Sequence, residues 1–99
     1  MILVRDVFRL KFGQSRQAME VWKEGRKIMD PIMKSHSPRI MTDLVGHFYT
    51  LVFETTYKDL GEYESTMKAG MSNEDWKKWY QKLLPFVEKG HREIFNIVE

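Results

Sequence analysis

The stretch MILVRDVFRLKFG, residues 1–13, decides the fold of this chain. Every second residue from Ile2 to Phe12 is apolar, with Asp6 as the single exception. Strict alternation over this length predicts a β-strand with one buried face. It also places a carboxylate on that face, where a charge must be paired, hydrogen-bonded or neutralised. The sequence therefore predicts a sheet, a core and one acidic residue inside it that needs a partner or a function.

The composition is that of one globular domain spanning residues 1–99. The chain is 42% hydrophobic and 30% charged, which is far from the composition of a disordered segment. It has no cysteine, which excludes disulfides, zinc–thiolate sites and thiol nucleophiles. Its longest uncharged stretch, 44–53, is about half of what a membrane span needs, and charges at Arg5 and Asp6 come too early for a signal peptide. We therefore expect a soluble, cytoplasmic protein with no membrane partner.

The charges favour a solvated surface over a nucleic-acid interface. Sixteen basic and fourteen acidic residues give a net charge of +2, and the two signs are interspersed. Arg16 precedes Glu20, and Arg26 precedes Asp30, at the i,i+4 spacing of paired charges on a helix. A nucleic-acid interface would collect one sign on one face, so we expect no nucleic-acid partner.

Two regions have helical patterning. Apolar residues recur at three-to-four spacing from about residue 16 to residue 28 or beyond, with Ser15 as the N-cap. Pro31 requires this helix to end, kink or restart. The second region is divided at Gly70, and capping residues begin its two parts: Asp59 with Glu62, and Ser72 with Asp75.

Three further strands complete the pattern. Two β-rich runs, 39–45 and 48–57, flank Gly46-His47 and predict a hairpin. Pro85 opens a short turn that ends near Gly90, and residues 92–98 form the last strand. The order β-α-β-β-α-β predicts an α+β, ferredoxin-like sandwich with an antiparallel sheet.

Both faces of this sheet carry large apolar residues, which predicts a second layer. Leu3 and Val7 lie opposite the alternating row of the first strand. The third strand is apolar on both sides, at Phe48 and Val52 on one side and at Leu51 and Phe53 on the other. Exposing such a residue forgoes about 1.5–3 kcal/mol, and three or four of them approach a domain's whole stability of about 5–15 kcal/mol. At this length the cover must come from another chain, so we expect a homodimer whose sheets face each other.

The sequence resembles a known superfamily along nearly its whole length. The resemblance is found in three segments: RDVFRLKFG (5–13), RIMTDLVGHFYTLVFETTYKDL (39–60) and REIFNIVE (92–99). They contain an aromatic-x-Leu-x-x-Gly end to the first strand and a Tyr-x-x-Leu entry to the second helical region. These features resemble the dimeric α+β barrels and, among them, the NIPSNAP-like proteins. The resemblance implies a sheet-on-sheet dimer with a pocket on the inner face of each sheet.

The same resemblance bears on chemistry. If the protein is an enzyme, it implies cofactor-independent monooxygenation or isomerisation of an activated organic substrate. Barrel relatives that degrade haem place an asparagine where this chain has Asp6, and they need a histidine on the second helical region. Trp79 stands near that position, and the region contains no histidine. We therefore expect no haem and no other cofactor.

Asp6 is the first candidate catalytic residue. On a desolvated face it could act as a general base, or it could be a structural carboxylate paired with an arginine, the more so if its face lies under the helices. Glu54, inside an apolar strand, is the second candidate, and the two could act as a pair across adjacent strands. The three histidines are dispersed with no metal-ligand spacing, so no metal site is expected: His36, His47 and His91.

Two interpretations of function follow. In the first, a small, largely apolar molecule binds in a pocket between sheet and helices, with Asp6 as a polar contact or base. Phe8, Trp76 and Trp79 would form its walls, although aromatic residues at helical spacing also suit a plain core. In the second, the protein is a non-catalytic structural or interaction protein whose barrel is only its dimer core.

Overall fold

The computed structural model describes all residues, 1–99, and has the predicted order of elements. Two short 3₁₀ helices, Lys34–His36 and Leu84–Phe86, supplement the main helices. The four strands form one antiparallel sheet in the order β2-β3-β1-β4. The α+β, ferredoxin-like prediction is confirmed, with the second helical region divided in two. The elements are β1 (Ile2–Leu10), α1 (Ser15–Met33), β2 (Arg39–Thr42), β3 (Thr50–Tyr57), α2 (Leu60–Met71), α3 (Glu74–Leu83) and β4 (Val87–Asn96).

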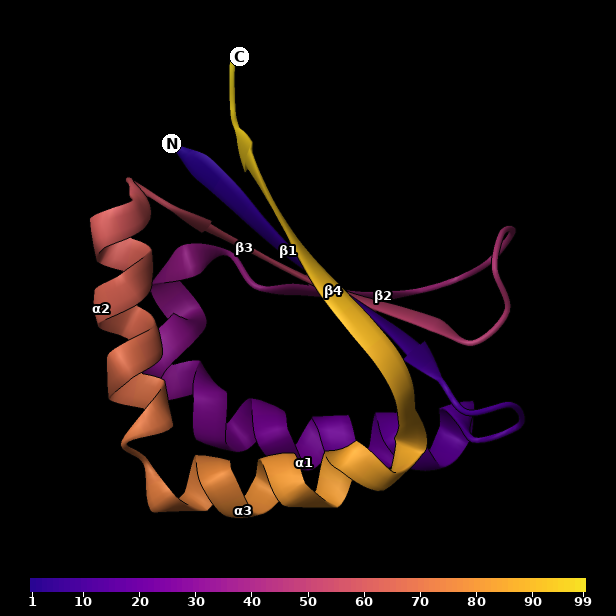
Figure 1. Cartoon of the computed structure of the whole chain (residues 1–99). Helices are drawn as coiled ribbons and strands as arrows, with labels where there is room; N and C mark the ends of the chain where they lie inside the picture. Colours follow the sequence, from indigo (N-terminus) through magenta and orange to yellow (C-terminus); the bar gives the residue numbers. More distant parts are fainter.

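All three helices lie on one side of the sheet (Figure 1). The alternating row of β1 faces them, with Val4 and Leu10 almost fully buried. Phe53 and Thr55 of the neighbouring β3 share this face, because β1 and β3 pair Asp6 with Phe53 and Val4 with Thr55. The other face of the sheet is not covered by any element of this chain.

The strand boundaries differ from the predicted ones at the turn of the hairpin and at both ends of β4. The hairpin strands are shorter, 39–42 and 50–57, because Asp43 Oδ1 accepts a hydrogen bond from Thr50 N at 2.9 Å and closes the ladder there. The last strand begins at Val87 and not at Arg92, because the segment after the turn pairs at once with β1. Gly90, expected in the turn, lies inside β4.

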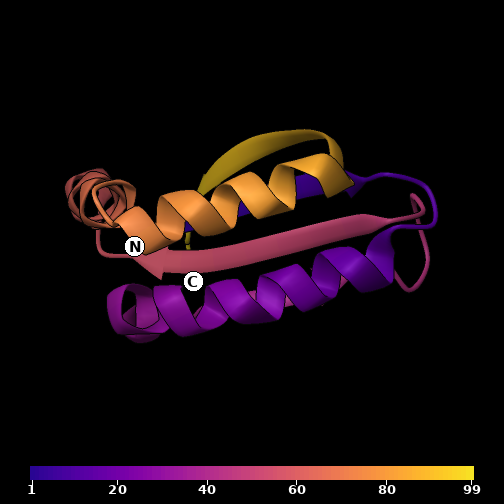
Figure 2. The same ribbon diagram turned by 90° about the horizontal axis from the view of Figure 1, so that it is seen from below.

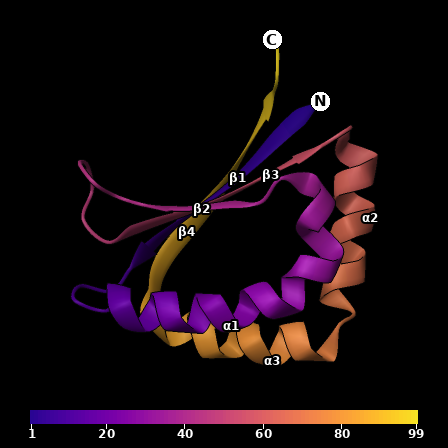
Figure 3. The ribbon, with the colours of Figure 1, turned by 180° about the vertical axis from the view of Figure 1, so that it is seen from behind.

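The helix boundaries also differ in part. Helix α1 continues through Pro31 to Met33, and its last turns bend away from the first part (Figure 3). Asp59 is confirmed as an N-cap, with Oδ1 accepting from Glu62 N at 2.9 Å. Ser72 is wrong as the second cap: the neighbouring Asn73 takes that place, and its Oδ1 accepts from Trp76 N at 3.0 Å. Ser15 is the first residue of α1, one position after the cap.

Helices α1 and α3 lie side by side beneath the sheet (Figure 2). Trp79 of α3 packs edge-on against Trp22 of α1, with 5.3 Å between ring centroids, and its Nε1 donates to Val21 O at 2.6 Å. The indole lies directly over Gly25, where an added Cβ would stand 2.1 Å from Trp79 Cε2. Only glycine allows the two helices to approach this closely.

We therefore expect Gly25→Ala to destabilise the fold by about 1–3 kcal/mol, the usual cost of overpacking a core. Gly70→Ala is the matched control, because a Cβ there meets nothing within 4 Å. Alanine at that helical position should be neutral or stabilise by up to about 1 kcal/mol. Urea unfolding of both variants measures the difference, and equal stability of the two would contradict the close contact.

Candidate functional site

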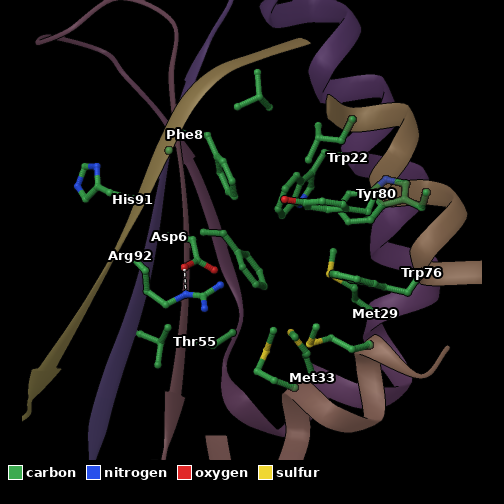
Figure 4. Close-up of a pocket in the computed structure, with 18 of the residues that line it drawn as sticks. Asp6, Phe8, Trp22, Met29, Met33, Thr55, Trp76, Tyr80, His91 and Arg92 are labelled. Carbon is green, nitrogen blue, oxygen red and sulfur yellow. Dashed lines mark hydrogen bonds and ion pairs between the residues drawn. The ribbon is translucent and has the colours of Figure 1, made fainter. Parts of the chain in front are cut away.

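A cavity of about 600 Å³ lies between the sheet and the helices (Figure 4). Sixteen of its 22 lining residues are hydrophobic. Phe8 borders it from the sheet side, while Trp22, Trp76 and Tyr80 border it from the helix side. Four flexible methionines complete the apolar lining, namely Met29, Met33, Met67 and Met71. Such a lining suits an apolar molecule of irregular shape.

The cavity has a polar edge formed by Asp6 and Arg92. These residues face each other in the β1–β4 register, and Asp6 Oδ1 accepts a hydrogen bond from Arg92 Nε at 2.5 Å. The Asp6 side chain is 18% exposed and that of Arg92 is 47% exposed. The hydrogen bond to Asp6 raises the pKa of Arg92 against the opposing effect of burial. The acidic residue predicted inside the strand face therefore has an arginine partner, and its role as a base stays a prediction.

Two buried tyrosines lie beside this edge. Tyr57 is 1% exposed and Tyr63 is 9% exposed, and both line the cavity. Neither hydroxyl has a hydrogen-bond partner of standard geometry within the chain, although Thr55 is close to Tyr57 and Arg92 is close to Tyr63. Burial raises the pKa of both tyrosines above the ordinary value of 10.0. Both side chains are therefore neutral donors at physiological pH.

The structure brings together four of the five predicted site residues. Asp6 and the three aromatic residues Phe8, Trp76 and Trp79 all line the cavity between sheet and helices. Glu54 does not, because it alternates with Phe53 and points to the other face of the sheet. There it lies 3.4 Å from Arg39 and 4.0 Å from Arg5. The hypothesis that Asp6 and Glu54 form a pair is wrong, since the sheet separates them.

Sequence reasoning missed Arg92, Tyr57 and Tyr63 as parts of the site. Tyr57 was within reach, because it belongs to the same alternating row of β3 as Phe53 and Thr55. The position of Arg92 opposite Asp6 depends on the register of β4 against β1. The prediction that this strand begins at Arg92, and not at Val87, concealed that register. Tyr63 reaches the site from α2, and nothing in its local pattern pointed there.

No group of three or more histidine, aspartate or glutamate side chains is arranged to hold a metal ion. None of the helices combines the length and the apolar character that crossing a membrane requires.

Comparison with known proteins identifies a family and a fold. The NIPSNAP family model matches residues 5–99. A search of curated proteins finds no match. Among solved structures, a NIPSNAP family protein from Agrobacterium tumefaciens superposes with a TM-score of 0.88 at 15% identity, covering 96% of this chain and 90% of that one.

Two more structures share the fold. An uncharacterised NIPSNAP-like domain protein from Burkholderia xenovorans gives a TM-score of 0.90 at 15% identity, with 98% of this chain and 84% of that chain covered. A putative antibiotic biosynthesis monooxygenase from Nitrosomonas europaea gives 0.74 at 9% identity, with both chains covered completely. At these identities the likeness concerns the fold alone.

We expect Asp6→Asn to destabilise the fold by about 1–2 kcal/mol, because it leaves Arg92 without its anionic partner. This value lies between those of surface and buried ion pairs, since Arg92 is half exposed and solvent screens the interaction. The control is Asp30→Asn, which breaks the 3.2 Å pair with Arg26 on the surface of α1 and should cost at most about 0.5 kcal/mol. Denaturant unfolding at pH 7 measures the free energy of unfolding of both variants. An Asp6→Asn variant as stable as the wild type would show that the ion pair does not contribute to stability.

Proposed function

This chain belongs to the NIPSNAP family, and we propose that it binds a small, largely apolar organic molecule in the cavity between its sheet and helices. The observation that carries the proposal is the cavity itself, about 600 Å³ with 16 hydrophobic lining residues and a few polar groups at one edge. Ligand sites typically have about 300–1,000 Å³ and this combination of lining. A simple core would be filled to close packing by its own side chains.

The chemistry we propose for this site is proton transfer without a cofactor. Arg92 occupies Oδ1 of Asp6, which leaves Oδ2 to accept a proton from an activated C–H bond of the bound molecule. The C–H bond breaks, its proton goes to Oδ2, and the electron pair is delocalised in the substrate. Return of the proton at another carbon completes an isomerisation. In a monooxygenation, the carbanion instead adds to dioxygen, and the peroxide takes the proton back from Oδ2. The hydroperoxide then loses water together with a second hydrogen of the same carbon, which becomes a carbonyl. Monooxygenation is the activity in the name of the Nitrosomonas europaea neighbour.

Binding can be tested with the apolar fluorescent probe N-phenyl-1-naphthylamine. We expect saturable fluorescence enhancement with the wild type and a loss of at least tenfold in affinity with Met67→Trp, whose indole would fill part of the cavity. Lys68→Trp is the control, because it places the same ring on the exposed face of the same helix. Equal binding by the two variants would place the probe outside the cavity.

A second candidate function, a dimer core without catalysis, is favoured by the uncovered face of the sheet. Val7 and Val52 lie at its centre and face away from the helices. Beside them, a row of charged residues of alternating sign crosses all four strands: Arg39, Glu54, Arg5 and Glu93. A row of alternating charges can face a second copy of itself across a two-fold axis with each positive residue opposite a negative one. We propose that another copy of this chain covers this face.

We expect sedimentation equilibrium at micromolar concentration to give about twice the 11.9 kDa chain mass. Val7→Glu should shift the assembly to monomers, because it adds an unpaired charge to the centre of the contact. Gln81→Glu adds the same charge on the exposed side of α3 and should leave the mass unchanged. A monomeric wild type would refute the two-sheet assembly. A dimer that binds no probe would support the dimer core as the whole function.

A further inference from the structure

A second hollow, of about 450 Å³, lies on the face of the sheet that the helices leave uncovered. Only two of its eight lining residues are hydrophobic, and none is acidic. Figure 4 shows one of its residues, His91, on the side of β4 away from the helices. Four lining residues have basic side chains: Arg9 of β1, Lys89 and His91 of β4, and His47 of the turn between β2 and β3. The hollow therefore gathers basic groups without a balancing carboxylate.

Two of these basic residues repel each other. Arg9 and Lys89 are direct partners in the ladder between β1 and β4, so their positive charges stand opposite each other on one face. Like charges in this arrangement destabilise a sheet. Neither side chain forms an ion pair within the chain. Both acidic residues of the strands on this face, Glu54 and Glu93, already pair with other arginines, so a second copy of the face would bring no spare carboxylate. A bound anion would relieve the repulsion.

The guanidinium of Arg9 is held in place by neutral acceptors of the turn. Its Nη1 donates to Phe48 O at 3.2 Å, and its Nη2 donates to Nδ1 of His47. These contacts use two of the five donors of a guanidinium and leave about three for a ligand. Because Nδ1 of His47 accepts a hydrogen bond, the ring is neutral and its proton is on Nε2, which is a further donor. Arg9 is thus oriented without being neutralised.

We propose that this hollow binds a phosphate group, either free or carried by a small organic monoester. A phosphate dianion has two negative charges, which match the positive charges of Arg9 and Lys89. Its oxygens accept hydrogen bonds from guanidinium, ammonium and imidazole groups. A neutral ligand would leave the repulsion between the two cations in place, and a carboxylate would balance only one of them. This inference goes beyond the proposed function, because the hollow and the apolar cavity lie on different faces of the sheet.

Titration calorimetry at about pH 8, where phosphate is mostly a dianion, tests the proposal at constant ionic strength. The probes are inorganic phosphate, glycerol 1-phosphate, dimethyl phosphate and acetate. We expect the first two to bind saturably and about tenfold more tightly than the last two, which carry a single charge. Tighter binding of glycerol 1-phosphate than of inorganic phosphate would identify a monoester as the ligand, and the reverse would identify free phosphate. Absence of saturable phosphate binding, or equal binding of dimethyl phosphate, would overturn the proposal.

Lys89→Gln and Arg9→Gln should each weaken the binding of inorganic phosphate by about fivefold or more. Lys89→Gln keeps the test valid if loss of the Arg9 contacts disturbs the turn, because the Lys89 side chain has no such contacts. Lys34→Gln is the matched control: it removes the same charge from another hollow, which Asp30 also lines, and should leave phosphate affinity unchanged. Equal losses of affinity in Lys89→Gln and Lys34→Gln would assign the binding to net charge alone and overturn the site.

Discussion

The close approach of Trp79 to α1 is the contact on which the arrangement of this molecule depends. The indole rests on the backbone at Gly25 and donates to Val21 O, so α1 and α3 are held together as one layer. Trp22 then extends this contact toward the sheet, with 5.3 Å between its ring centroid and that of Phe53. These aromatic rings thereby join the helices to the sheet. The cavity lies where the rings and the methionines leave space between the two layers.

A strand at the edge of the sheet completes the site. β4 pairs only with β1, and the register of this pair places Arg92 beside Asp6. Gly90 lies opposite Phe8 in the same ladder, where a Cβ would stand 3.1 Å from Phe8 Cδ1. One strand pairing thus provides both the polar edge of the cavity and the space for its aromatic wall. Among the polar residues that line the cavity, the one most remote in sequence from Asp6, Arg92, is the one that pairs with it.

The two faces of the sheet have different chemistry because side chains alternate along a strand. Asp6 and Glu54 are both acidic residues in apolar strands, yet one lines the cavity and the other joins a row of charges on the uncovered face. The proposed apolar ligand and the proposed second copy therefore occupy separate surfaces. Occupation of one leaves the other accessible, so ligand binding and dimerisation are compatible in one molecule.

The sequence by itself determined the class of fold, the order of the elements and three aromatic residues of the lining, Phe8, Trp76 and Trp79. These follow from local periodicity: alternation in Ile2–Leu10, and three-to-four spacing around Trp22 and Trp79, are visible without any partner segment. Only the tertiary structure decided which polar groups meet. Arg92 reaches Asp6 across 86 residues of sequence, and Glu54 is turned away from it, because strand register and the side on which helices pack are set by contacts between distant segments.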